Sequence, residues 1–147
     1  MEYLMTYGWA FLIAAIVIGA LFASGVFNPP TPQQCLIQAG LQCLNYYMAT
    51  NGMLTLSIIQ FMSTPINVTA IGCNQNETIV HMQSYSPNIE MQVDANYTFN
   101  APCYSSTGAQ FSGSPGEAFR GYLIINYTDI ETGFPQVAYG QISVDVK

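Results

Sequence analysis

The chain has 147 residues, half of them hydrophobic and only 7% charged, with a formal net charge of −6. This length leaves room for one apolar helix and one further domain of about 115 residues. Arg120 and Lys147 are the only basic residues. Because no basic face is available to neutralise phosphates, nucleic acid is excluded as a partner.

The first 28 residues form an apolar segment that carries no charge from Thr6 to Val26. About 20 uncharged helical residues span the roughly 30 Å hydrocarbon core of a bilayer. Apolar side chains point in every direction, which is typical of a helix surrounded on all sides by lipid or protein. We therefore predict a hydrophobic helix over residues 3–27, within a first domain of residues 1–28. No Lys or Arg precedes it, so we expect that a basic leader has been removed.

Small residues recur at helical spacing within this segment. Ala15, Gly19 and Ala23 form one row, and Ala10 and Ala14 form another. Such rows let helix backbones approach each other closely. They favour packing against other helices, although membrane-spanning helices in general carry some Gly and Ala.

Residues 29–32 (PPTP) predict a stiff connector, because proline prevents helix continuation and favours extended backbone. The second domain is then expected over residues 33–147.

Beyond the connector, apolar residues alternate with polar ones, as expected for strands with one buried and one wet face. The alternation is clearest over 88–99, and it recurs at 66–70 and 119–127. Further strand candidates are 53–62, 77–83 and the last residues of the chain, with loops at 104–118 and between Asn126 and Pro135, while 33–50 is ambiguous between a short helix and a strand. The predicted fold class is α+β, a long hydrophobic helix followed by an antiparallel, immunoglobulin-like β-sandwich.

The apolar phase shifts within the last predicted strand. Val137 and Tyr139 hold one phase, whereas Ile142, Val144 and Val146 hold the other. The shift falls at Gly140, which predicts a β-bulge there.

Four cysteines follow the helix, at positions 35, 43, 73 and 103. They form no CxxC pair and His81 is the only histidine, so zinc is not predicted. An even number in a membrane-tethered domain favours two disulfides in an oxidising compartment. We prefer Cys35–Cys43 with Cys73–Cys103, because the first two lie in one short segment and the others adjoin strand-like runs. The alternative is four buried free thiols.

Asn67, Asn76, Asn96 and Asn126 each begin an N-x-T sequon. The first, third and fourth fall in the phase opposite to the apolar residues of their predicted strands, so they point outward as a glycan requires. We predict N-glycosylation at all four, with coincidence in an Asn- and Thr-rich chain as the alternative.

The sequence contains no catalytic constellation, and we predict neither an enzyme, nor a metal site, nor a cofactor. His81 lies in a strand-like run and is expected to be half-exposed. Asp94, Asp129 and Glu131 are not accompanied by a calcium-loop motif. We expect all three to be solvated acids in loops.

The residues Glu2–Ala10 (EYLMTYGWA), the apolar run after them and Phe27-Asn28-Pro29 resemble archaeal type IV pilins of the class III signal peptide family. The resemblance implies a leader removed by a prepilin peptidase and assembly by a pilus machinery. It assigns the helix of Tyr3–Phe27 to a filament core packed against copies of itself, and the β-domain to the outer sheath. It also implies that Glu2 pairs with a neighbour's N-terminus; otherwise Glu2 is an acid favoured by the helix macrodipole. Archaellins share this architecture, but the Tyr-Gly-Trp start favours a pilin.

The leading hypothesis is therefore a structural subunit of an extracellular pilus-like filament, used for surface adhesion and motility. It would be membrane-inserted before assembly and bound afterwards to copies of itself in a helical homopolymer. One alternative is a single-pass, membrane-anchored β-sandwich binding protein on the cell surface. A secreted domain cleaved near Ala23-Ser24-Gly25 is another.

Overall fold

The structure is a computed structural model that describes residues 2–27, 32–38, 40–78 and 80–147. The chain forms two compact units, residues 1–31 and 32–147. The predicted connector, 29–32, lies outside the described residues except for Pro32.

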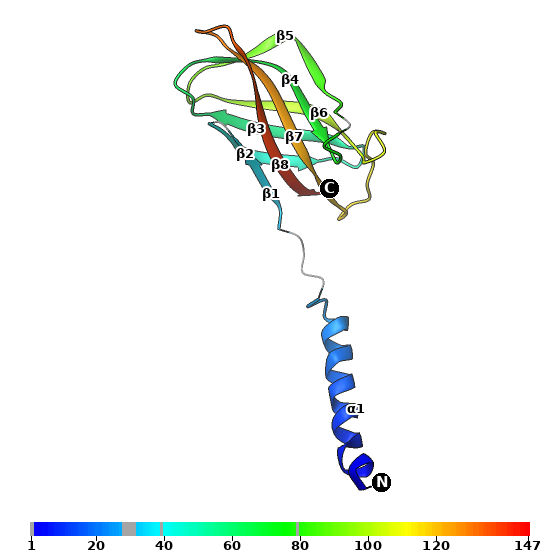
Figure 1. The fold of residues 1–147 in the computed structure, drawn as a ribbon. Helices are drawn as coiled ribbons and strands as arrows, with labels where there is room; N and C mark the ends of the chain where they lie inside the picture. Colours follow the sequence, from blue (N-terminus) through cyan, green and yellow to red (C-terminus); the bar gives the residue numbers. More distant parts are fainter. Residues whose placement is uncertain (1, 28–31, 39, 79) are drawn as a thin grey trace. The chain divides into compact units, whose positions relative to one another are not determined.

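The first unit contains one helix, α1 (Glu2–Ala23), as predicted (Figure 1). It contains no proline, and its Ala, Leu and Ile residues are compatible with a helix. The helix ends four residues earlier than the predicted Phe27. Gly25 adopts φ +72°, and its N–H donates to the Phe22 carbonyl at 3.2 Å. Glycine accepts this left-handed conformation without strain, so Gly25 terminates the helix.

The described residues of the second unit form eight strands, β1 (Gln34–Ile37), β2 (Leu41–Met48), β3 (Met53–Gln60), β4 (Ile66–Asn74), β5 (Gln83–Met91), β6 (Asn96–Tyr104), β7 (Ala118–Asp129) and β8 (Pro135–Asp145). The strands predicted at 53–62, 66–70 and 119–127 are confirmed, and the ambiguous segment 33–50 forms β1 and β2. The Ser- and Gly-rich loop separates β6 from β7 as expected. The loop after Asn126 is shorter than predicted, because β7 continues to Asp129.

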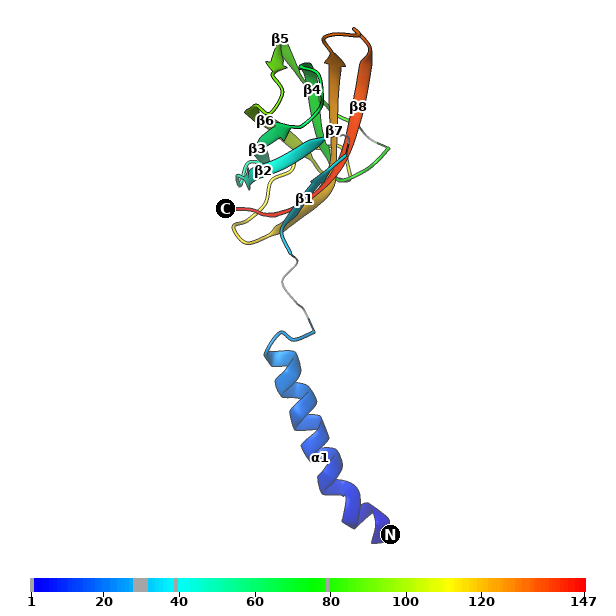
Figure 2. The same cartoon turned by 90° about the vertical axis from the view of Figure 1, so that its left-hand side faces the viewer.

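The strands form a nearly closed, barrel-like sheet in the order β1-β8-β7-β4-β6-β3-β2, with β5 paired to β4 (Figure 2). The strands at the two ends of this order, β1 and β2, are joined by the Cys35–Cys43 disulfide, and Met48 of β2 also bridges to Val146 just after β8. Hydrogen bonds also join β4 to β6 at Cys73 and Cys103. The α+β class is therefore confirmed, but the second unit is not clearly the predicted immunoglobulin-like sandwich, since its strands are joined around the core.

Both predicted disulfides are present. Cys35–Cys43 joins β1 to β2, and Cys73–Cys103 joins β4 to β6. The cysteines of the second pair are fully buried. All four cysteines are thus paired, and no free thiol remains among them.

Two strand predictions were wrong. The alternating segment 88–99 is not one strand, because β5 ends at Met91, a turn follows and β6 starts at Asn96. The turn spans four residues, an even number, so the period of two continues across it unchanged. Asp94 lies in this turn with φ +58°. The segment predicted as a strand at 77–83 is irregular in its described residues up to Met82, and only Gln83 begins β5.

The predicted β-bulge at Gly140 is also wrong. Gly140 lies in unbroken register between Leu123 of β7 and Ile37 of β1. A Cβ atom at Gly140 would lie 2.5 Å from the Leu36 carbonyl oxygen. The glycine therefore permits the close approach of β1 and β8. The apparent phase shift arises because Val137 and Tyr139 do face outward, with 46% and 57% of their surfaces exposed.

The core of the β-domain comes from residues of that domain alone, nearly all of them on its strands. Its largest fully buried side chains include Phe99, Phe119, Met48 and Leu123. With this core and both disulfides inside residues 32–147, the unit has what an independently folding domain requires.

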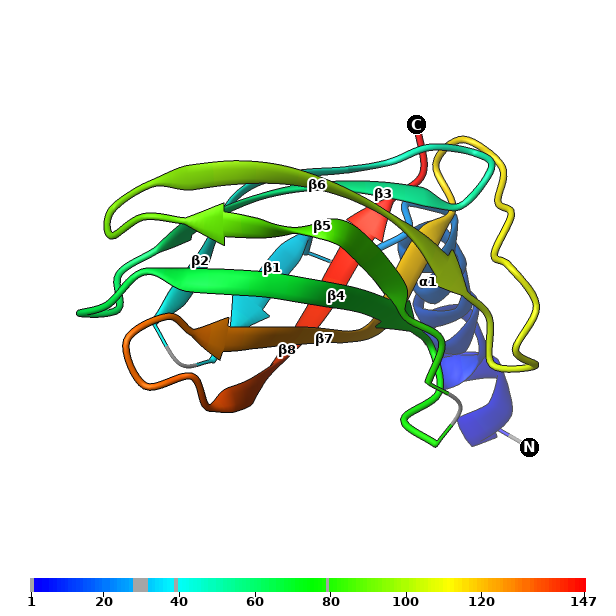
Figure 3. The same ribbon diagram turned by 90° about the horizontal axis from the view of Figure 1, so that it is seen from above.

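A buried amide organises the loops at one end of the β-domain. Gln60 is fully buried, and its Nε2 donates to the carbonyls of Thr64 at 3.1 Å and Met91 at 3.0 Å. Its Oε1 accepts from the Met62 N–H at 3.2 Å. The β3–β4 and β5–β6 loops are therefore held side by side at this end (Figure 3).

We expect Gln60→Leu to lower the free energy of unfolding by about 3 kcal/mol, because it leaves three backbone groups without partners. Gln42→Leu, at an exposed position of β2, is the control and should change stability by less than about 0.5 kcal/mol. Urea unfolding followed by near-UV circular dichroism measures both. Equal stability of the two variants would contradict this role of Gln60.

Candidate functional site

Helix α1 exposes its apolar surface on every side, and none of its residues is buried. Leu4, Phe11 and Phe22 are each exposed over more than 60% of their surfaces. It is the one helix among the described residues that is long and apolar enough to cross a membrane. Exposure of this extent in water is unfavourable by roughly 25 cal/mol per Å² of apolar surface. The helix therefore requires lipid or other protein around it.

The predicted small-residue positions all lie on α1 and are exposed: Ala10, Ala14, Ala15, Gly19 and Ala23. The first two lie in an apolar concavity on the helix surface, between the larger side chains of Tyr3, Leu4, Tyr7 and Phe11. A Cβ atom built at Gly8 or at Gly19 meets nothing within 4 Å. Among the described residues, no contact within the chain requires a glycine at either position.

Glu2 is the first residue of α1. Its carboxylate lies at the positive end of the helix macrodipole, which stabilises an acid there. The Glu2 backbone carbonyl accepts a 2.7 Å hydrogen bond from the Thr6 hydroxyl. The predicted pairing of Glu2 with a neighbouring subunit remains a prediction.

Three of the four sequon asparagines lie on strands. Asn67 on β4 and Asn126 on β7 are half-buried and alternate with fully buried neighbours, so both face outward. Asn96, at the start of β6, is exposed. The outward phase of these residues agrees with the sequence pattern, and glycan occupancy remains a prediction.

The fourth sequon lies in the irregular segment between β4 and β5. The Asn76 Oδ1 accepts from the N–H and the hydroxyl of Thr78 at 2.9 and 2.8 Å. Both hydrogen bonds of this turn use the Oδ1 atom of Asn76, so its Nδ2 atom takes no part in them. At Asn126, by contrast, Nδ2 lies 3.6 Å from the Met82 sulfur.

The residues weighed for chemistry lie apart. His81 is exposed and lies outside the strands. Its ring stacks on that of Tyr104, with the ring centroids 4.4 Å apart. Asp129 accepts hydrogen bonds from Thr132 and Thr64, which hold the pKa of its carboxyl below the usual range. Within the described ranges, no group of three His, Cys, Asp or Glu side chains is placed to hold a metal ion.

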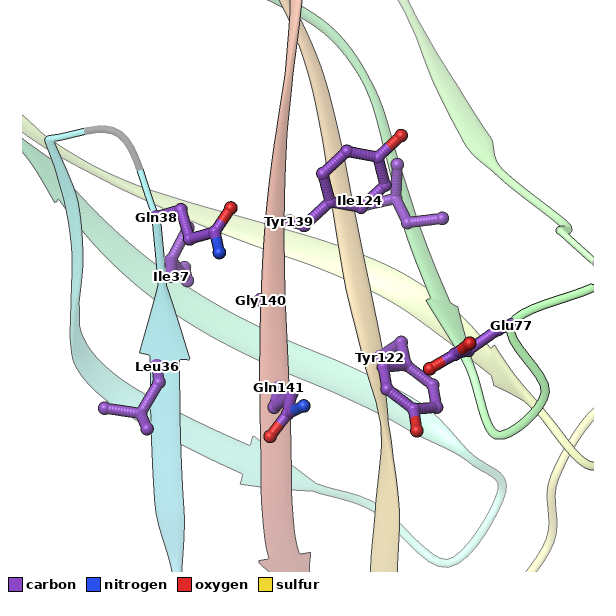
Figure 4. Close-up of a pocket in the computed structure, with 9 residues that line it drawn as sticks. All are labelled: Leu36, Ile37, Gln38, Glu77, Tyr122, Ile124, Tyr139, Gly140 and Gln141. Atoms are coloured by element: carbon purple, nitrogen blue, oxygen red, sulfur yellow. The ribbon is translucent and has the colours of Figure 1, made fainter.

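The outer face of β1, β8 and β7 contains a groove of about 580 Å³ (Figure 4). Leu36 lies on one side of it, and Tyr122 and Ile124 lie on the other, with Tyr139 and Gln141 of β8 between them. These side chains meet because the register places Leu36 opposite Gln141 and Gln141 opposite Tyr122. We call this the β1–β8–β7 groove.

One wall of the groove comes from the irregular segment after β4. Glu77 lies beside Tyr122, and its carboxylate raises the pKa of the Tyr122 phenol. Asn74 anchors the segment, because its side chain donates to the His81 carbonyl at 3.1 Å and accepts from the His81 N–H at 3.0 Å. The segment thus folds over the outer face of β4, against Gly72, where no side chain obstructs it.

Sequence reasoning missed this groove. The one signal for it in the sequence is the outward phase of Tyr139, which the periodicity argument assigns to a bulge at Gly140. Nothing in the sequence locates Glu77 beside Tyr122, because that contact depends on the path of the irregular segment.

We compared the chain with models of known protein families and with curated proteins. Neither comparison finds a match.

Proposed function

We propose that the protein is a structural subunit of an extracellular, type IV pilus-like filament that polymerises through α1. The observation that carries this proposal is a 22-residue apolar helix with no buried residue. A helix of this kind needs an apolar environment along its whole length. Copies of the same helix can supply that environment as well as lipid can.

The assembly step exchanges one apolar environment for another. Before assembly, lipid surrounds α1 at little cost, since about 22 residues at 1.5 Å each match the bilayer core. In a filament, each incoming subunit buries the same surface against helices already present. Identical subunits that repeat by a rotation that does not close form an open helical polymer.

The small residues support close packing in that core. Gly8, Ala10 and Ala14 leave room between larger side chains, so a neighbouring helix can approach there. In this proposal Glu2 pairs with the N-terminus of an adjacent subunit. A prepilin peptidase and a pilus assembly machinery are the further partners, and adhesion and surface motility are the uses of the filament.

The β-domain forms the outer surface in this proposal. Two disulfides support an oxidising, extracellular location. The outward sequon residues Asn67, Asn96 and Asn126, together with Asn76, are proposed to carry N-glycans.

A second candidate is a single-pass surface protein whose β-domain acts as a monomeric binding module. The length of α1 supports this candidate as much as it supports the filament subunit, since the helix matches one bilayer span. The two candidates differ in whether anything depends on contacts between copies of α1.

Gly19→Leu separates the two candidates. A side chain at this position meets open space within the chain, and replacing glycine favours the helix by up to about 1 kcal/mol. We therefore expect the variant to insert into membranes normally but to yield less than about a tenth of the wild-type filaments, since a leucine blocks close helix approach.

Negative-stain electron microscopy of material sheared from cells measures filament yield, and membrane fractionation measures insertion. Val17→Leu, which enlarges a nearby side chain that is already large, is the control and should assemble. Wild-type cells without filaments would favour the monomeric anchor, and normal filaments from Gly19→Leu would refute close packing at this row.

A further inference from the structure

We propose that the β1–β8–β7 groove binds neutral sugar residues. Tyr139 and Leu36 both line the groove, and 57% and 62% of their surfaces are exposed. Gln38 and Gln141 add two amide groups, and Glu77 adds a carboxylate. An aromatic or aliphatic surface next to planar hydrogen-bonding groups matches a sugar ring, whose C–H face is apolar and whose edge carries hydroxyls.

The size of the groove fits this class of ligand. Its volume of about 580 Å³ lies within the range of small-molecule sites. Its rims come from different strands, β1 and β7, with β8 between them (Figure 4). The floor is rigid, because β8 pairs with β1 on one side and β7 on the other.

The charges of the groove favour a neutral ligand. Among the described residues that line it, only Glu77 is charged. Arg120 lies two residues before Tyr122 on β7 and does not line the groove. A carboxylate without a lining cation disfavours sulfated, phosphorylated or carboxylated sugars.

The same polar groups argue against a second copy of the chain as the occupant. An apolar side chain seated in the groove would cover the amides of Gln38 and Gln141 without replacing their hydrogen bonds to water. Burying such a group unpaired costs about 1–3 kcal/mol. Sugar hydroxyls both donate and accept, so a sugar satisfies the amides and Glu77 together.

Sugar residues can reach the groove from two sources. One is a glycan outside the protein. The other is a glycan of the chain itself, since Asn76 adjoins Glu77 and Asn126 follows Ile124 by two residues on β7. The shared chemistry is the proposal, and the experiment distinguishes the sources.

The first test uses the full chain, produced with its disulfides in a bacterial periplasm without N-glycans and held in lauryldimethylamine oxide, a detergent without a sugar headgroup. Saturation-transfer NMR titrations with mannotriose, maltotriose and triacetylchitotriose are compared with sialyllactose. We expect at least one neutral trisaccharide to bind at millimolar concentration and sialyllactose to bind more weakly. No binding of any neutral trisaccharide would overturn the proposal.

Two groove variants give the test its specificity. Tyr139→Ala should weaken the trisaccharide about tenfold, whereas Tyr47→Ala, at an exposed tyrosine of β2 outside the groove, should not. Gln141→Leu keeps the shape of the side chain but removes its amide, so it should also weaken binding. If Gln141→Leu instead leaves sugar binding unchanged and increases self-association, the occupant is a second copy and the proposal fails.

The second test uses the chain from a glycosylating host, with Thr78→Val and Thr128→Val each removing one sequon. If a glycan of the chain fills the groove, added trisaccharide binds only after one of these changes. If the unchanged glycoprotein binds it directly, the source is external, and either result supports a sugar site. Sugar binding and filament formation can be tested separately, because we expect Tyr139→Ala to leave filament yield unchanged. Loss of filaments in this variant would instead place the groove in an interface between subunits.

Discussion

Ala15→Asp should abolish filaments and leave the β-domain folded. Ala15 lies in the uncharged part of α1, far from either end of the helix. An aspartate near the middle of a membrane-spanning helix costs about 2.5–3.5 kcal/mol on insertion scales. In a filament core the same charge would be buried without a cation, since the helix contains no basic residue. Every subunit would carry this penalty, so the loss should be complete.

Filament yield in shear fractions, measured by electron microscopy, tests this prediction. Ala15→Asn is the matched variant, because it adds nearly the same volume without the charge and should retain more filament than Ala15→Asp. Ser112→Asp adds a charge in an exposed loop of the β-domain and should assemble normally. Normal filaments from Ala15→Asp would exclude a filament core made of α1.

Removing the Cys73–Cys103 disulfide should lower the stability of the β-domain more than removing Cys35–Cys43. The first bridge joins residues 30 apart in sequence, and the second joins residues 8 apart. Restriction of the unfolded chain then contributes about 3.6 kcal/mol for the long loop and about 2.5 kcal/mol for the short one. Cys73 and Cys103 are also fully buried, so their loss removes packing as well.

The comparison uses the double alanine variants of each pair. Chemical unfolding under non-reducing conditions gives the free energy of each, and addition of reductant to the wild type provides an independent reference. A larger loss for Cys35→Ala/Cys43→Ala would show that closure of the barrel between β1 and β2, rather than the β4–β6 link, dominates stability.

Local sequence patterns predicted those elements whose environment is uniform along the chain. The extent of α1 followed from an uncharged apolar run, and its end differed only because Gly25 accepts a left-handed conformation. Strands with one buried face, such as β4 and β7, were predicted from Ile66, Val68, Leu123 and Ile125, which are buried as expected.

The errors share a physical cause, which is that periodicity records the polarity of neighbours but not the path of the backbone. The turn after Met91 spans an even number of residues and keeps the period of two, so β5 and β6 looked like one strand. In β8, the apolar Tyr139 points outward, where polar residues are expected, because it lines the groove on the outer face of the sheet. The buried Gln60, which satisfies loop backbone groups, gave no local signal at all.

The sequence by itself determined that an apolar helix precedes a disulfide-bonded β-domain almost without basic charge. These properties depend on composition and on contacts between residues near one another in the chain. Only the tertiary structure decided that the strands close into a barrel-like sheet and that Leu36, Tyr122 and Tyr139 come together beside Glu77. Those contacts join segments up to about a hundred residues apart, and they depend on strand register and on the path of an irregular segment, which no local pattern encodes.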